Sequence, residues 1–236
     1  MIGLAGHRDD VPAGWRMKIG LGPDEVALHQ LLTLVPDAGA WAERLAASPL
    51  FSVAAVDGGT VAHWMQLSPE HDPAGFPLGR VTLGGFGVLL EAFSEPRLQE
   101  LVRRVEETGT GRITRDQVRV IPVADAVSEP NHVLQPLQDS RGDALTRREI
   151  AAMYLRMAWP FLESEEFGGR RPEAVLHSRG TGESLDSILE GLAPKLRERI
   201  PTFPAFAGDE LRDLLTAAPP IPSPSRSAPA GEPRKD

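Results

Sequence analysis

The sequence predicts an α+β protein, because strand-like and helix-like periodicities follow one another along the same 236-residue chain. The clearest strand signal is a pair of β-rich runs around Asp57-Gly58-Gly59, whose glycines permit the positive φ of a hairpin turn. The clearest helix signal is the run 94–108, which begins at Ser94-Glu95-Pro96 and carries an apolar stripe. We therefore expect an N-terminal mixed module of order ααβββαβ, followed by a helical C-terminal region and a disordered tail.

Two helices are expected to open this module. The first covers residues 23–34, because Pro and two acidic residues in a first turn favour a helix N-terminus and the apolar positions that follow keep a helical period. The second covers residues 37–47, with Asp37 as its N-cap and Trp41 and Leu45 on one side.

The strands come next in the chain. The hairpin is expected to pair residues 51–56 with 60–67, and the polar, Pro-rich segment 68–78 is expected to be a loop. A strand resumes over 80–90, where three glycines predict a bulge or a close backbone approach. After the helix at 94–108, the run 117–123 predicts another strand, and the Pro within it favours an edge position.

The C-terminal half reads as helices. A capping box at Thr146-Arg147-Arg148-Glu149 starts a helix that Pro160 bends or ends, with Ile150, Met153, Tyr154 and Met157 on one face. The expected divisions of the chain are an arm (1–22), the α+β module (23–125), a linker or long loop (126–142), the helical C-terminal region (143–216) and a disordered Pro/Ser/Ala-rich tail (217–236).

Composition limits the classes of function. The formal net charge is −8 without a basic face, which argues against a nucleic-acid partner. The chain has no Cys, which excludes disulfides and thiol chemistry, and it has no apolar run long enough for a membrane span. The start of the chain lacks the pattern of a signal peptide, and Ala, Gly and Pro are abundant. We therefore expect an acidic, bacterial, cytoplasmic protein without a membrane partner.

One stretch, residues 174–194, invites a functional interpretation. A strand ending in His177, a turn at Gly180 and a helix closing on Gly-Leu-x-Pro resemble the first motif of ADP-ribosyltransferases, in which a His-Gly pair contacts NAD. Ser178 and Arg179 separate the two residues here, and the single Tyr of the chain lies upstream rather than downstream of the motif. The preferred interpretation is a structural strand, turn and helix with its leucines in a core.

Two acidic clusters are also candidate sites. The loop that holds His71 and Asp72 has groups that can bind a metal or act as acid and base, but no second metal-ligand motif accompanies it. Glu163, Glu165 and Glu166 are typical of a solvated face. No P-loop, nucleophile elbow or dinucleotide fingerprint is present, so no cofactor and no metal are expected.

The leading functional hypothesis is a non-catalytic protein that acts by binding another protein. One alternative is an enzyme whose site forms around His177 and Arg179, or around His71 and Asp72. A further alternative is an accessory or structural component of a larger assembly, of phage origin. The sequence leans against an enzyme without deciding the question.

Overall fold

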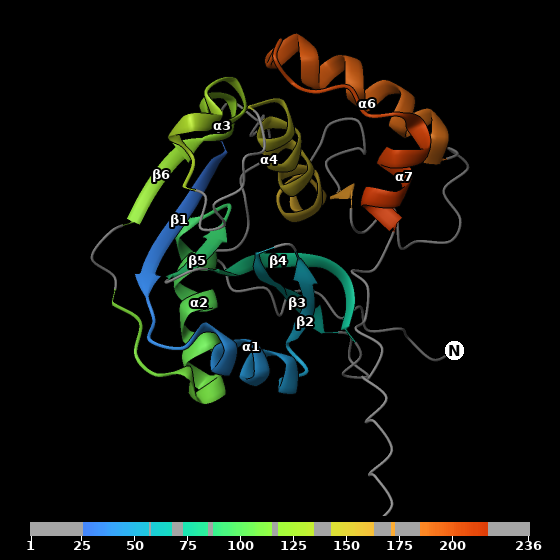
Figure 1. Ribbon diagram of the computed structural model, residues 1–236. Helices are drawn as coiled ribbons and strands as arrows, with labels where there is room; N and C mark the ends of the chain where they lie inside the picture. The colour runs from blue at the N-terminus through green and yellow to red at the C-terminus, as the bar shows by residue number, and fades with distance from the viewer. Residues whose placement is uncertain are drawn as a thin grey trace, which may run out of the picture.

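A six-stranded antiparallel sheet organises the chain (Figure 1). This computed structural model describes residues 26–56, 58–67, 73–84, 87–114, 118–134, 143–162, 171–172 and 185–216. The strand order is β2-β3-β4-β5-β1-β6. The strands are β1 (Ala27–Leu34), β2 (Phe51–Val56), β3 (Gly59–Leu67), β4 (Pro73–Gly84), β5 (Gly87–Ala92) and β6 (Val118–Pro122).

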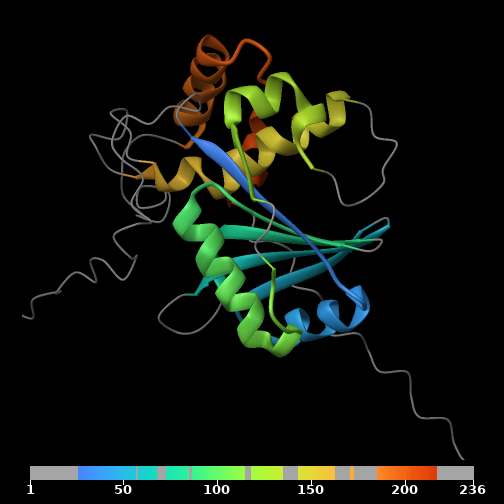
Figure 2. The same cartoon turned by 90° about the vertical axis from the view of Figure 1, so that its left-hand side faces the viewer.

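Helices cover both faces of this sheet (Figure 2). They are α1 (Ala38–Ala47), α2 (Glu95–Val105), α3 (Val123–Ser128), α4 (Asp143–Met157), α6 (Leu185–Arg199) and α7 (Gly208–Thr216). Neighbouring residues of β4 show the two faces, since side chains alternate along a strand. A Cβ on Gly79 would lie 3.0 Å from Leu101 of α2, whereas Arg80 reaches Glu149 of α4. Helices α1 and α2 therefore pack on one face, and α4 packs on the other.

The α+β class is confirmed, but the first predicted helix is wrong. Residues 27–34 form strand β1, which pairs with β5 on one side and β6 on the other. Leu28 and Gln30 are buried on one face and Leu31 on the opposite face. A strand that is buried on both faces loses the polar alternation that marks an amphipathic strand, and its apolar spacing then imitates a helix.

Two further predictions in this module need correction. Residues 73–78, expected in a loop, belong to β4, which pairs with β3 through an irregular register at Met65 and Leu67. Gly84 and Gly87 do not form a bulge, because they pair with each other across the β4–β5 hairpin. The alternative prediction of a close approach is confirmed at Gly87, where a Cβ would lie 3.3 Å from Leu32. The observed order up to β6 is therefore βαββββαβ rather than ααβββαβ.

Other local predictions are confirmed. Asp37 caps α1 by accepting a hydrogen bond from the Ala40 backbone N–H at 2.9 Å, and Trp41 and Leu45 are buried. The β2–β3 hairpin forms with Gly58 at φ +83°. Strand β6 lies at the edge of the sheet.

The expected linker contains ordered structure where the chain is described. Helix α3 and the 3-10 turn Pro130–His132 occupy its first part, and Val127 is fully buried. Its remainder, residues 135–142, lies outside the described residues. The linker prediction missed this packing because Ala126 and Val127, two small apolar residues, signal a core contact only once a partner helix is in place.

One hydrophobic core joins the two regions. Tyr154 of α4 packs edge-on against Phe93, which follows β5, and against Phe203, which precedes α7, with ring centroids 6.2 and 6.3 Å apart. The buried Arg97 of α2 donates a hydrogen bond to the Met157 carbonyl at 2.6 Å, so α2 also contacts the end of α4. The helical C-terminal region is thus part of the same packing unit as the sheet.

The remaining differences concern the chain ends and α6. Helix α6 continues through Pro194, where the sequence predicts that it closes, because Leu192, Leu196 and Ile200 keep a four-residue spacing and are all buried. The predicted arm and the predicted tail both lie outside the described residues. Within the described ranges, no helix has the combined length and apolar character of a membrane span.

Candidate functional site

The residues that the sequence singles out for chemistry lie outside the described part of the chain. These are His71, Asp72, His177 and Arg179, together with the acidic residues 163–166. Their roles therefore stay predictions. Across the described residues, no group of three His, Asp or Glu side chains is placed to hold a metal ion.

A row of polar residues crosses the α4-facing side of the sheet. Strand register places one member of the row on each strand, in the order Ser52, His63, Arg80, Glu91, Gln30 and Arg119. Glu91 and Gln30 are fully buried, and Ser52 is also buried. Buried polar groups are costly without partners, so each member of the row needs an account of its contacts.

Glu91 is the centre of a buried ion cluster. One carboxylate oxygen accepts from Arg80 Nε at 2.5 Å, and the other accepts from Gln30 Nε2 at 2.8 Å. Arg80 also donates from Nη1 to Glu149 of α4 at 2.5 Å. The two carboxylates raise the pKa of the Arg80 guanidinium against the opposing effect of its burial. This cluster attaches α4 to the middle of the sheet.

Gln30 continues the network toward the chain that follows α3. Its Oε1 accepts from the Leu134 N–H at 2.9 Å, and its Nε2 donates to the Leu134 carbonyl at 3.2 Å. The amide therefore binds both backbone groups of one residue and Glu91 at the same time. This arrangement uses both donors and one of the two acceptor lone pairs of the Gln30 amide in a structural role.

Two further polar groups, Thr82 of β4 and Arg156 of α4, lie on this side of the sheet near His63. Burial, followed by the nearby guanidinium groups of Arg156 and Arg80, lowers the pKa of His63 to about 3. Burial also lowers the pKa of Arg156 on α4. The buried Nε of Arg156 and the buried Oγ1 of Thr82 have no hydrogen-bond partner among the described residues. Among the described residues, this patch of β4 and α4 therefore holds two buried polar atoms without hydrogen-bond partners.

A groove of about 390 Å³ lies on the opposite face, between α2 and the paired strands β1 and β6. Its volume falls in the range of ligand-binding clefts, roughly 300–1,000 Å³. Its apolar lining comes from Leu31, Leu98, Val102, Val118 and Val120. Its polar lining comes from His29, Glu95 and Gln99.

Strand β6 forms the outer wall of this groove and is open to solvent. Val118 and Val120 are 47% and 56% exposed, although they lie on the same sheet face as the buried Leu31. One side of β6 pairs with β1, and no described strand pairs with the other side. An edge strand with exposed apolar side chains is a template for pairing with another chain.

The polar end of the groove is rich in hydrogen-bond acceptors. His29 has a buried Nδ1 without a hydrogen-bond partner among the described residues. Burial lowers the pKa of His29, and the carboxylate of Glu95 opposes this shift. A neutral imidazole beside an exposed carboxylate offers lone pairs rather than a positive charge, so this end of the groove favours a cationic donor.

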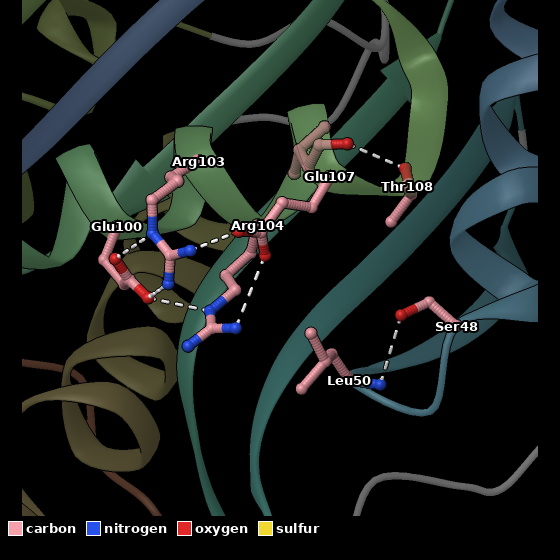
Figure 3. A network of polar contacts seen from close by, with 8 residues as sticks. Ser48, Leu50, Glu100, Arg103, Arg104, Glu107 and Thr108 are labelled. Atoms are coloured by element: carbon pink, nitrogen blue, oxygen red, sulfur yellow. Dashed lines mark hydrogen bonds and ion pairs between the residues drawn. The ribbon is translucent and has the colours of Figure 1, made fainter.

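The outer surface of α2 carries a separate set of charges (Figure 3). Glu100 pairs with Arg103 and Arg104, and Glu107 pairs with the same two arginines. The spacing of three or four residues makes these ordinary helix-surface pairs, each worth about 0.3–0.5 kcal/mol. They contribute to the solubility of the helix and do not line the groove.

Sequence reasoning missed both described sites, although each has a local signal. Glu91 is the single charged residue in the apolar run 87–93, and such a residue in a buried strand requires a partner. The partner could not be identified without the register of β4 against β5. The exposed valines of β6 look like ordinary strand residues until the edge position is known.

No protein-family model, curated protein or solved structure shows significant similarity to this chain.

Proposed function

We propose that the protein binds a partner protein by adding an extended segment of that partner to the free edge of β6. The observation that carries this proposal is the groove with its exposed wall: Val118 and Val120 stand beside an apolar cleft on an edge that no described strand pairs with. Backbone hydrogen bonds along the edge would supply affinity, and the cleft would select side chains, as in other cases of β-strand addition.

The lining of the groove defines the chemistry of that segment. Side chains on one face of a strand recur every two residues, about 6.6 Å apart. The groove wall has the same spacing, because the cross-strand pairs His29–Val120 and Leu31–Val118 are two residues apart. A Lys or Arg beside Val120 would extend its aliphatic stem across the valine toward Glu95. An aliphatic residue two positions away would then pack beside Val118.

Composition supports a basic partner segment and a reducing compartment for this interaction. The chain is acidic, which favours association with a basic segment, and it has no Cys, in keeping with a reducing compartment. We place the interaction in the bacterial cytoplasm, consistent with the high Ala, Gly and Pro content. An accessory role in a larger assembly is compatible with the same surface.

The experiment is a selection of random ten-residue peptides on the wild-type protein, followed by titration of the enriched peptides. We expect peptides with a basic and an aliphatic residue two positions apart, and NMR shifts confined to β1, β6 and α2. Val120→Lys should abolish binding, since its ammonium group would occupy the site beside Glu95. Val56→Lys on the opposite edge strand β2 is the matched control, because Val56 is also exposed there.

Two results would overturn the proposal. One is equal binding of the enriched peptides to wild-type protein and to Val120→Lys. The other is a selection that yields no saturable binder. Circular dichroism of each variant confirms that the exposed substitutions leave the fold intact.

A further inference from the structure

The α4-facing side of β3 and β4 holds unsatisfied buried groups that the proposed protein-binding function does not use. Strand register places Val61 opposite Thr82 and His63 opposite Arg80, so these residues form two adjacent rows on one sheet face. Thr82 is buried and its hydroxyl has no partner in the described part of the chain. Arg156 lies seven residues after Glu149 on α4, which is two helical turns and the same helix face.

The two carboxylates of this patch, Glu91 and Glu149, are bound by Arg80 rather than by Arg156. The formal charges of Arg80, Arg156, Glu91 and Glu149 sum to zero, but both carboxylates bind Arg80. Within the ranges that the structure describes, the Nε of Arg156 has no acceptor. Arg156 as a whole is half-buried, and its Nε is the buried part. A buried donor without a partner lowers stability, and such features concentrate at functional sites.

We propose that Arg156 binds the carboxylate group of a small-molecule ligand, with the His63 imidazole and the Thr82 hydroxyl as additional donors. The guanidinium presents Nε and one Nη as a planar fork, which matches the two oxygens of a carboxylate. The neutral imidazole donates one N–H, and the hydroxyl donates its proton.

The charge sum favours a single negative charge on the ligand. The cluster is neutral when empty, so a carboxylate brings it to −1, whereas a phosphate dianion would bring it to −2 beside Glu91 and Glu149. The half-buried Val61 pairs with Thr82 across the strands, and the buried Met153 lies three residues before Arg156 on α4. They suit an aromatic or aliphatic body attached to the carboxylate.

The pKa of His63 supports this assignment without carrying it. A pKa of about 3 keeps the imidazole neutral throughout the physiological range. The ligand therefore meets one free cation rather than two, and its affinity should be constant between about pH 6 and pH 8.

The test is an NMR titration of the full chain with benzoate, read at the Arg156 Nε–H resonance. We expect a saturable shift, no comparable shift with benzamide, and weaker binding of inorganic phosphate. Arg156→Gln should abolish binding, and Arg156→Lys should weaken it at least tenfold because the planar fork is lost. Arg103→Gln is the control, since this arginine is exposed on α2.

Thermal unfolding adds an independent reading. The Tm of Arg156→Gln should equal or exceed that of the wild type, because the substitution removes a half-buried charge whose Nε has no acceptor among the described residues. A lower Tm would show that Arg156 is structural and would overturn the proposal. Equal shifts with benzoate and benzamide, tighter binding of phosphate, or unchanged binding by Arg156→Gln would overturn it as well. None of these results depends on β6, so this test is separate from that of the proposed function.

Discussion

Arg80 and Glu91 stand directly opposite each other on β4 and β5, with the Arg80 Nε 2.5 Å from a Glu91 carboxylate oxygen. The Glu91 side chain is fully buried, and that of Arg80 is 12% exposed. Glu91 also accepts from Gln30 of β1, and Arg80 also donates to Glu149 of α4. The Arg80–Glu91 pair therefore connects β1 and α4 to the centre of the sheet.

The first prediction concerns this pair. Glu91→Ala should lower the free energy of unfolding by about 3–5 kcal/mol, because it leaves Arg80 buried with part of its charge uncompensated. Urea denaturation measures the change. Glu107→Ala is the control, since its ion pairs are exposed on α2, and it should cost less than about 1 kcal/mol. Similar losses of unfolding free energy for both variants would mean that burial of the Arg80–Glu91 pair adds nothing to its contribution to stability.

The second prediction concerns pH. His63 has a folded-state pKa of about 3, below its unfolded value near 6.5, because it is buried and faces Arg80 and Arg156. The unfolded chain therefore binds the proton first, and stability falls as pH drops below about 6.5. Between about pH 7.5 and about pH 5 this contribution is roughly 2 kcal/mol.

His63→Gln should remove that part of the pH dependence, as measured by the free energy of unfolding at the two pH values. Glu91 and Glu149 are the acidic groups of the same cluster and remain in both proteins. His132→Gln is the control, because this histidine is exposed in the 3-10 turn after α3, and it should keep the wild-type dependence. Identical pH profiles for wild type and His63→Gln would refute the assignment.

The third prediction concerns the core beneath α2. Leu101 is fully buried and lies within 3.0 Å of the position that a Gly79 Cβ would take, so the helix and sheet pack closely here. Leu101→Ala should cost about 2–5 kcal/mol in the free energy of unfolding. Leu34→Ala removes the same atoms from a side chain that is 79% exposed, and should change stability by about 0.5 kcal/mol or less. A cost for Leu34→Ala comparable to that of Leu101→Ala would show that another part of the chain covers Leu34.

The fourth prediction concerns the β2–β3 turn. Gly58 has φ +83°, and a Cβ there would meet no atom within 4 Å, so the cost of Gly58→Ala is purely conformational. We expect a loss of about 1 kcal/mol. Gly208 is equally open but has no positive φ, and it starts α7, so Gly208→Ala should be neutral or stabilising. Thermal denaturation of the two variants compares them directly, and an unchanged Tm for Gly58→Ala would contradict the turn geometry.

The sequence by itself determined the features that depend on near neighbours. The turn at Gly58, the cap of Asp37 on α1, the buried face of α4 and the edge position implied by Pro122 all follow from residues within a few positions of one another. These features are set by backbone conformation and side-chain reach, which act over one turn of chain. That is why the α+β class and most element positions could be predicted.

Only the tertiary structure decided what depends on distant partners. Residues 27–34 have a helical apolar spacing, yet they form β1 because β5 and β6 supply hydrogen bonds on both sides and helices cover both faces. The Arg80–Glu91 pair, the half-buried Arg156 near His63 and the groove beside Val120 arise from strand register and helix placement. No local pattern encodes these contacts, since the free energy that fixes them comes from burying groups far apart in the chain.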